Sequence, residues 1–429
     1  MPLADSSLAY ALHGAAAAVA EIISGRNLNE ALSGLWRERP SLPPGQRGAV
    51  QDLAYTALRR CGRDDFYLSR LMDTPLRDKP VHALLLVALA RLAARPEEAH
   101  TIVDQAVEAA GELAQGKYKA LVNGVLRNFL RRRNELEAAA GQDEAARWQH
   151  PRWWIDRLRQ AHPGYWQALL EAGNGRPPMT LRVNRRRVAA ADYLGQLQAA
   201  GLAARLLGGD AILLERPVPV ERLPGFADGL CSVQDAGAQR AAPLLDVHDG
   251  LRVLDACAAP GGKAAHILEC AAVDLTALDA DAGRALRVSE NLLRLGLQAH
   301  VRPADCRETD AWWDGRDFDR ILADVPCTAS GVVRRHPDAK WLRREQDIAQ
   351  FARTQGEILD ALWRVLAPGG KLLYATCSLF PEENGRQVAA FAARQEDCMR
   401  LPIAGMPELL LLPAEEHDGF YYALLEKQA

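Results

Sequence analysis

The chain has 429 residues, of which 48% are hydrophobic and 25% charged, and its 52 Lys and Arg against 55 Asp and Glu give a net charge of −3. This is ordinary globular composition, which excludes a disordered, collagen-like or coiled-coil protein, and the length predicts roughly two to four domains. A near-neutral charge also argues against a nucleic-acid-binding protein, unless basic residues are concentrated in one segment.

The eight cysteines are expected to be free thiols. No two of them have the CxxC spacing of zinc ribbons or thioredoxin-like proteins. No stretch approaches the roughly 20 apolar residues of a membrane span, and the N-terminus lacks the basic start of a signal peptide. We therefore expect a cytoplasmic protein without metal or membrane, and nothing in the sequence requires more than a monomer.

Residues 1–140 are predicted to form an all-α bundle. Runs rich in alanine, leucine and arginine recur with helical spacing, and no segment alternates as a strand does. Short connections between helices of this length favour compact packing. The expected helices are Leu8–Ile23, Gly45–Arg60, Val81–Ala94, Thr101–Leu113 and Tyr118–Arg132.

Residues 141–230 are predicted to form a small basic α/β module or structured linker. Its strands are expected at Met179–Asn184, followed by three arginines, and at Ala211–Leu214, with a helix over Ala190–Ala200 between them. The basic excess of the chain lies here. A cluster of tryptophans opens the module, and we expect core packing rather than base stacking for its members, Trp148, Trp153, Trp154 and Trp166.

Residues 231–429 alternate between strand and helix patterns, which predicts a Rossmann-like parallel sheet with helices on both faces. The expected strands are Leu251–Leu254, Asp274–Leu278, His300–Ala304, Arg320–Ala323 and Lys371–Thr376. The expected helices are Ala264–Cys270, Ala282–Leu295 (N-cap Asp281, C-cap Gly296), Arg343–Leu366 and Glu382–Arg394. An antiparallel pair, Leu409–Leu412 and Gly419–Glu426, is expected to close the sheet.

A polar or reactive residue ends each of the five parallel strands. Because ligands bind at the carboxyl ends of such strands, we expect one shared site rather than five separate features. Any single acid among them could equally be a helix N-cap. The five residues are Asp255, Asp279, Asp305, Asp324 and Cys377.

The first strand leads into a glycine-containing loop, Asp255–Lys263, with the sequence DACAAPGGK. It lacks the GxGxxG spacing of dinucleotide binders, which argues against a dehydrogenase. Gly261 and Gly262 still permit close approach of a ligand, and Asp279 stands where nucleotide-binding folds hold ribose hydroxyls. These features indicate a nucleoside without pyrophosphate, such as S-adenosylmethionine. For the loop alone, a simple packing turn is an equally good interpretation.

Two of the cysteines, Cys327 and Cys377, follow neighbouring candidate strands beside this loop. A lone cysteine is usually a small buried hydrophobe, which is the interpretation we prefer for the cysteines outside the site. Two thiols at adjacent strand ends instead suggest a covalent nucleophile.

Three runs resemble the motifs of the Nol1/Nop2/Sun family of RNA cytosine-5 methyltransferases: Asp255–Lys263, Asp324–Gly331 (DVPCTASG) and Ala375–Asn384 (ATCSLFPEEN). The helical N-terminus resembles NusB-like RNA-binding domains. Together these resemblances imply a class I S-adenosylmethionine-dependent methyltransferase acting on small-subunit (16S) ribosomal RNA, either naked or in an early assembly particle. The same chemistry on transfer RNA is one alternative, and a non-catalytic RNA-binding or antitermination factor is another.

The resemblance also implies roles for individual residues. Cys377 would add to C6 of the cytosine, Cys327 would assist proton removal or product release, and Asp324 would hold the base. The implied cofactor contacts are Cys257, Ala258, Ala259, Pro260, Gly261, Gly262, Lys263, Asp279, Asp305 and Asp324. The target base must be unstacked to expose its ring face. Candidate phosphate contacts are Arg182, Arg185, Arg186, Arg187, Arg334 and Arg335.

Overall fold

The structure is a computed structural model that describes residue 3 and residues 6–429. The chain forms two compact units, Met1–Gly175 with Val333–Glu345, and Arg176–Val332 with Gln346–Ala429. The sequence predicted three segments, 1–140, 141–230 and 231–429, and residue 140 lies inside the helix Lys119–Gln142.

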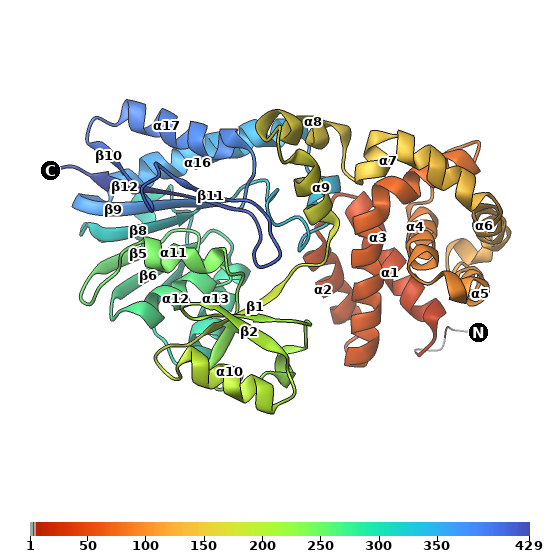
Figure 1. Ribbon diagram of the computed structural model, residues 1–429, viewed down its shortest axis with the longest axis horizontal. Coiled ribbons are helices and arrows are strands. Elements are labelled where there is room, and N and C mark those ends of the chain that lie inside the picture. Colours follow the sequence, from red (N-terminus) through yellow and green to blue (C-terminus); the bar gives the residue numbers. More distant parts are fainter. Residues whose placement is uncertain (1–2, 4–5) are drawn as a thin grey trace. The chain divides into compact units, whose positions relative to one another are not determined.

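The first unit is entirely helical (Figure 1). Its helices are α1 (Leu8–Ile23), α2 (Leu28–Glu38), α3 (Pro44–Leu71), α4 (Lys79–Ala94), α5 (Ala99–Ala109), α6 (Lys119–Gln142), α7 (Glu144–Trp148), α8 (Arg152–Ala161), α9 (Trp166–Asn174) and α15 (Ala339–Leu342). All five predicted helices are confirmed. The sequence did not predict α2 and α7–α9, which are short helices of 5 to 11 residues.

The centre of this unit is α4, which is buried on nearly every side from Val81 to Leu92. A helix that is apolar all round is typical of a bundle core. Small residues let α1 approach its neighbours closely, and a Cβ added at Gly14 would lie 3.1 Å from Val50. Trp148 and Trp154 are buried, as predicted for core tryptophans.

The second unit begins with a small antiparallel sheet of order β2-β3-β1-β4. Its elements are β1 (Met179–Val183), β2 (Ala204–Gly208), β3 (Ala211–Leu214), β4 (Cys231–Val233) and the helix α10 (Ala190–Ala199). The predicted strands and helix are confirmed, whereas β2 and β4 were not predicted.

The second sheet of this unit has the order β10-β12-β9-β8-β5-β6-β7, with β11 paired to β12. Its parallel strands are β5 (Arg252–Asp255), β6 (Asp274–Asp279), β7 (His300–Pro303), β8 (Phe318–Asp324) and β9 (Leu366–Thr376). Three further strands, β10 (Cys398–Leu401), β11 (Leu409–Leu411) and β12 (Phe420–Lys427), run antiparallel to their neighbours. Both the parallel sheet and the antiparallel closure are confirmed.

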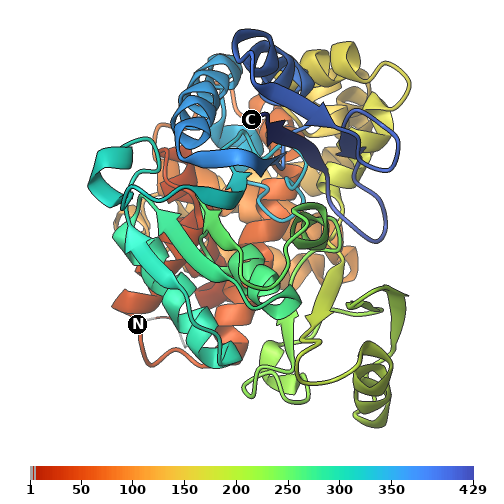
Figure 2. The same cartoon turned by 90° about the vertical axis from the view of Figure 1, so that its left-hand side faces the viewer.

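Helices cover both faces of this sheet, as Figures 1 and 2 show. One face carries α11 (Ala241–Leu244), α12 (Gly262–Cys270) and α13 (Ala282–Leu295), and the other carries α14 (Thr309–Trp312), α16 (Glu345–Arg364) and α17 (Gly385–Arg394). Alternate residues of each strand enter opposite cores, since Val253 packs with the first set of helices and Leu254 with the second.

The ends of α13 were predicted correctly. Asp281 accepts a hydrogen bond from the N–H of Arg284, and Gly296 ends the helix with a φ of 68°. In the part of the chain that the structure describes, no helix is both long and apolar enough to cross a membrane.

Candidate active site

The five residues predicted at strand ends meet at the carboxyl edge of the parallel sheet. Neighbouring strands β5, β8 and β9 place Asp255 beside Leu322 and Asp324 beside Ala375, one residue before the end of β9. The loop Cys257–Lys263 then turns over this edge. The sheet order therefore brings the three motifs into one site.

Lys263 joins the glycine loop to the end of β8. Its Nζ lies 2.5 Å from Oδ2 of Asp324, and its side chain is 12% exposed. Burial alone would lower the pKa of Lys263, but the carboxylate of Asp324 raises it, with smaller contributions from Cys377 and Asp255. Lys263 is thus a cation held among the groups that the sequence predicted to act on the base.

The two predicted reactive thiols lie together. Sγ of Cys327 is 3.3 Å from Sγ of Cys377. The hydrogen bond to Cys377, followed by burial, raises the pKa of the Cys327 thiol well above its usual value. Cys377 is half-buried and Cys327 is buried. This arrangement favours Cys327 as the protonated partner of the pair.

Close backbone packing holds the loop of Cys327 against the end of β9. The N–H of Gly331 donates to the carbonyl of Cys377 at 2.8 Å, and its own carbonyl accepts from Gly419 at 2.9 Å. A Cβ at Gly331 would lie 2.5 Å from the carbonyl oxygen of Gly419 and 2.9 Å from that of Cys377. Only glycine fits this approach without displacing one of the backbones.

The glycine loop has the geometry of a ligand cradle. Gly261 has a φ of 98° and starts α12, whose first turn has no side-chain cap. The N–H groups of that turn are therefore available to a ligand. Ala258 donates to the carbonyl of Leu278 at 2.7 Å, which fixes the loop on β6.

Asp279, predicted to hold ribose hydroxyls, borders this loop at the end of β6. Its Oδ2 accepts a hydrogen bond from the N–H of Ala259 at 3.3 Å and lies 3.1 Å from Nη2 of Arg284. Arg284 is the more exposed partner of this pair, with 57% of its side chain accessible. Asp279 is therefore held next to the loop by the N–H of Ala259 and by an exposed surface cation.

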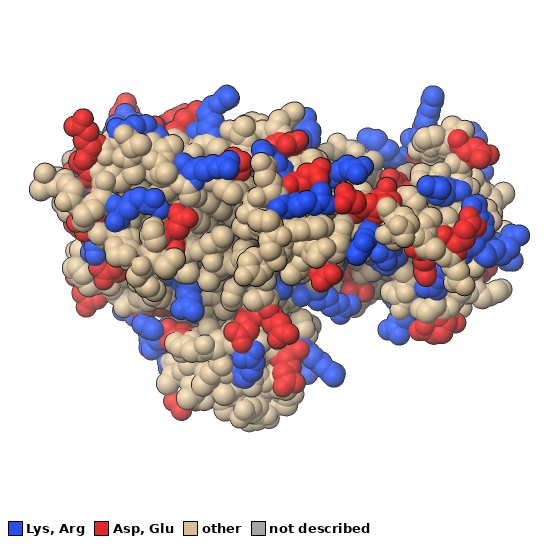
Figure 3. All heavy atoms as spheres, turned by 45° about the horizontal axis from the view of Figure 1, so that its top comes forward, with Lys and Arg blue, Asp and Glu red and all other residues tan. Residues whose placement is uncertain are grey.

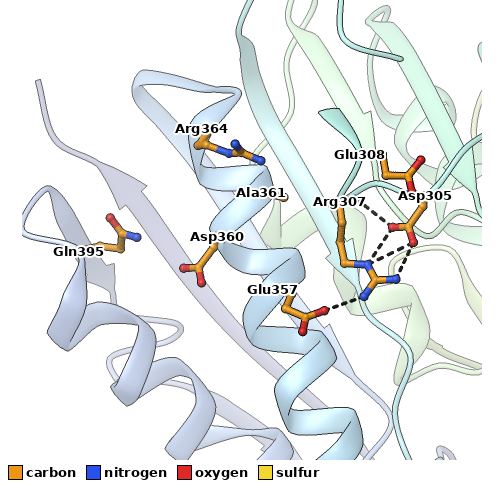
Figure 4. A pocket seen from close by; sticks show the side chains of 8 residues that line it. All are labelled: Asp305, Arg307, Glu308, Glu357, Asp360, Ala361, Arg364 and Gln395. Atoms are coloured by element: carbon orange, nitrogen blue, oxygen red, sulfur yellow. Dashed lines mark hydrogen bonds and ion pairs between the residues drawn. The ribbon is translucent and has the colours of Figure 1, made fainter. Parts of the chain in front are cut away.

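Asp305, predicted to hold an adenine amine, is paired with Arg307 (Figure 4). Both oxygens of the carboxylate accept bonds from this guanidinium, which also reaches Glu357 of α16 at 2.6 Å. Hydrogen bonds from Arg307 hold the pKa of Asp305 below its usual value. A cavity of about 720 Å³ adjoins these three side chains. Asp305 thus remains an ionised acceptor beside open space.

Two residues of the glycine loop, Asp255 and Cys257, have raised pKa values. Asp255 is fully buried, neither of its oxygens has a hydrogen-bonding side-chain partner, and burial with the nearby charge of Asp324 raises its pKa to about 7. A hydrogen bond to Cys306, together with burial, raises the pKa of Cys257 well above its usual value. A raised pKa favours the protonated form of Cys257, which is a weak nucleophile.

The prediction that Arg182 contacts RNA phosphate is wrong. Its side chain is fully buried and forms two 2.8 Å bonds with Glu269 of α12. One guanidinium nitrogen also donates to the carbonyl of Gly262 at 2.7 Å and to Oε1 of Gln234. Arg182 thus links the small sheet to the glycine loop and cannot reach a bound polyanion.

The three arginines that follow also make internal bonds, although they are exposed. Arg185 pairs with Asp210 at 2.7 Å, whereas Arg186 and Arg187 donate to main-chain carbonyls of Leu268 and Leu295. Arg334 is buried, with a relative exposure of 6%. Arg185, Arg186 and Arg187 therefore form bonds within the protein, and they remain candidates for binding a ligand. Basic and acidic side chains are interspersed over the face drawn in Figure 3.

Sequence reasoning gave no role to Glu383, which the structure places beneath both cysteine loops. Its side chain is fully buried and bonds the residues that directly follow Cys327 and Cys377. The only signal for it was its place in the motif Ala375–Asn384. Among the described residues, no group of three or more His, Cys, Asp or Glu could hold a metal ion.

A parallel sheet with a glycine loop, strand-end acids and a thiol pair defines the class of Rossmann-like methyltransferases. Three family models match this chain: NusB family over residues 9–131, the ferredoxin-like domain of RsmF/B-like methyltransferases over 150–221, and 16S rRNA methyltransferase RsmB/F over 242–426. The chain belongs to the RsmB/F family of 16S rRNA methyltransferases.

Curated relatives match along nearly the whole chain. Ribosomal RNA small subunit methyltransferase B of Vibrio cholerae is 44% identical over 422 residues, covering 96% of both chains. The Klebsiella pneumoniae protein of the same name is 43% identical and covers 96% of this chain and 97% of its own.

Among solved structures, PH0851 matches 98% of this chain and 99% of its own with a TM-score of 0.83 at 22% identity. A methyltransferase homologue from Pyrococcus horikoshii matches 66% of this chain and 97% of its own with a TM-score of 0.59 at 27% identity. NSun6 from the same organism, solved with SFG, matches 65% of this chain and 98% of its own with a TM-score of 0.58 at 20% identity. These likenesses agree with the fold described above.

Proposed function

We propose that this protein transfers a methyl group from S-adenosylmethionine to C5 of a cytosine in small-subunit ribosomal RNA, through a covalent bond between Cys377 and C6 of the base. The observation that carries the proposal is the thiol pair, with its sulfurs 3.3 Å apart, next to the ion pair of Lys263 and Asp324. The names of the curated relatives support ribosomal rather than transfer RNA as the substrate.

The donor set of the site fits S-adenosylmethionine. This cofactor supplies an electrophilic methyl group on a positively charged sulfur, and it presents ribose hydroxyls and an adenine amine as hydrogen-bond donors. The carboxyl oxygens of Asp279 and Asp305 are acceptors suited to these donors, and the uncapped N–H groups that begin α12 suit its carboxylate. NSun6, a protein of similar fold, was solved with SFG.

The thiols would act in sequence on the base. The Cys377 thiolate adds to C6 and makes C5 electron-rich, so that C5 can take the methyl group as the sulfur–methyl bond of the donor breaks. Removal of the C5 proton then re-forms the double bond and expels Cys377. Cys327, whose thiol touches Cys377, is placed to assist that proton removal or the release of product.

The ion pair would act on the polar edge of the cytosine. Asp324 is 29% exposed, so its carboxylate can accept hydrogen bonds from the exocyclic amine and from N3 of the cytosine when N3 is protonated, while Lys263 neutralises part of its charge. The positive charge of Lys263 also favours the Cys377 thiolate. We place the reaction in the cytoplasm, on a monomer, with either naked RNA or an early assembly particle as substrate.

Methyl transfer from tritiated S-adenosylmethionine tests this proposal. The wild-type chain should label small-subunit ribosomal RNA at 5-methylcytosine and leave transfer RNA unlabelled, and Cys377→Ser should abolish the signal because the serine hydroxyl is not ionised at neutral pH. Full activity of Cys377→Ser would refute the nucleophile, and labelling of transfer RNA alone would refute the substrate.

A further inference from the structure

Glu383 lies completely buried between the loops that carry the two cysteines. It ends the short turn Pro381–Glu383, a few residues beyond Cys377, and its relative exposure is 0%. Burial raises the pKa of this carboxyl, and hydrogen bonds from Ser378 and Thr328 counteract that effect. A buried carboxylate is strongly unfavourable unless donors surround it.

Four donors converge on Glu383. Its Oε1 accepts from the N–H of Thr328 at 2.8 Å and from Nε2 of Gln355 at 3.2 Å. Its Oε2 accepts from the hydroxyl of Thr328 at 2.6 Å and from that of Ser378 at 2.5 Å. Both oxygens are therefore saturated, as an ionised carboxylate requires.

These partners connect Glu383 to both reactive loops. Thr328 directly follows Cys327, and Ser378 directly follows Cys377. Gln355, on α16, also donates to the carbonyl of Pro326, on the other side of Cys327, at 2.9 Å. One carboxylate thus ties two loops that are 50 residues apart in the chain to each other and to a helix.

We propose that Glu383 is a positioning residue for methyl transfer, because its carboxylate binds Thr328 and Ser378 and thereby fixes Cys327 and Cys377 against each other. This inference rests on the proposed function of the two thiols. Neither oxygen of Glu383 touches the glycine loop, since both are occupied by the four donors described above. Its effect should therefore fall on the chemical step and not on cofactor binding.

The charge of Glu383 also distinguishes the two thiols. The groups that raise the pKa of Cys327 are its hydrogen bond to Cys377, burial, the charge of Cys377 and that of Glu383. The charge of Cys377 is in turn among the causes that raise the pKa of Lys263. The nearby negative charge of Glu383 thus helps to keep Cys327 protonated.

Two variants separate the role of Glu383 in positioning the two thiols from the effect of its negative charge. In Glu383→Gln, the hydroxyls of Thr328 and Ser378 can rotate to accept from the new amide, so the shape of the cluster is kept and its charge is lost. Glu383→Ala removes both. Glu396→Gln makes the same chemical change at an exposed carboxylate of this unit and serves as the control.

Single-turnover methylation and S-adenosylmethionine titration by calorimetry are measured on the full chain. Displacing reacting groups by about 1 Å costs about 100-fold in rate, so Glu383→Ala should lose about that factor while its Kd for S-adenosylmethionine stays within about threefold of wild type. Glu383→Gln should recover part of the rate, and Glu396→Gln should match wild type.

Alkylation by iodoacetamide without RNA, read for each cysteine by mass spectrometry, reports the charge effect. Loss of one neighbouring negative charge should raise the labelling rate of Cys327 relative to Cys377 about tenfold in Glu383→Gln. A purely structural residue would not change this ratio.

The inference is overturned if wild type methylates RNA and both Glu383 variants do so within about twofold of it. It is also overturned if their loss of rate matches an equal loss of cofactor affinity. If wild type itself forms no methylated cytosine, the proposed function fails instead, so the two failures are distinguishable.

Discussion

Replacing Arg182 with methionine should destabilise the catalytic unit without directly affecting RNA contacts. The side chain is 0% exposed, and the substitution would remove two 2.8 Å bonds to Glu269 and the bond to the carbonyl of Gly262. Glu269 would then be a buried acid without its partner. Removing one member of a buried ion pair costs about 3–5 kcal/mol, which lowers the Tm of a unit of this size by about 6–20 °C.

The assay is thermal unfolding followed by circular dichroism, together with RNA binding over a range of salt concentrations. The double variant Arg182→Met with Glu269→Leu should recover most of the loss, because an apolar pair can replace a buried ion pair. Arg205→Met changes an exposed arginine of the same unit, whose side chain is 52% accessible, and should alter unfolding by less than about 0.5 kcal/mol. If Arg182→Met left Tm unchanged and reduced the salt dependence of RNA binding, Arg182 would be a phosphate contact and the structural role would be refuted.

Three further predictions follow from the same geometry. Gly331→Ala should leave the fold intact by circular dichroism but lower methyl transfer at least about tenfold, because its Cβ would push on the carbonyl of Cys377; unchanged turnover would contradict this. Lys263→Met should slow iodoacetamide labelling of Cys377 and reduce turnover, since the nearby cation favours the thiolate; equal labelling would argue against that role. Burial lowers the pKa of Lys340 to about 7. Between pH 7 and about 10, the unfolded chain therefore binds one proton more than the folded chain does. The free energy of unfolding of wild type, measured with urea, should rise over this range relative to that of Lys340→Met. An equal pH dependence in the two proteins would show that the pKa of Lys340 is not lowered.

The parts of the fold that the sequence predicted are those with strong local periodicity. The ends of Leu8–Ile23 and Ala282–Leu295 were predicted to the residue, because apolar spacing and capping residues are local signals. The short strands Ala204–Gly208 and Cys398–Leu401 were missed. Both are the outermost strands of their sheets. Pairing with the neighbouring strand stabilises them more than the β-propensity of their own residues does.

The site was only partly predictable for a related reason. Strand-end placement predicted that Asp324 and Cys377 share one site, since that follows from the topology of a parallel sheet. The contact of Lys263 with Asp324 depends on β5 and β8 being neighbours, which spacing along the chain does not reveal. Arg182 was misinterpreted because its partner Glu269 lies 87 residues away in the chain. The residues next to Arg182 look the same whether its side chain is buried against that partner or exposed to solvent.

The most direct test of the proposed mechanism is to locate the covalent bond to RNA. Cys327→Ala should accumulate an adduct with small-subunit ribosomal RNA that survives a denaturing gel, because the step that releases Cys377 is impaired. After nuclease and protease digestion, mass spectrometry should find a 5-methylated cytosine attached to the peptide that contains Cys377. A nucleotide on any other cysteine, or efficient methylation by a variant that also lacks Cys377, would contradict the account.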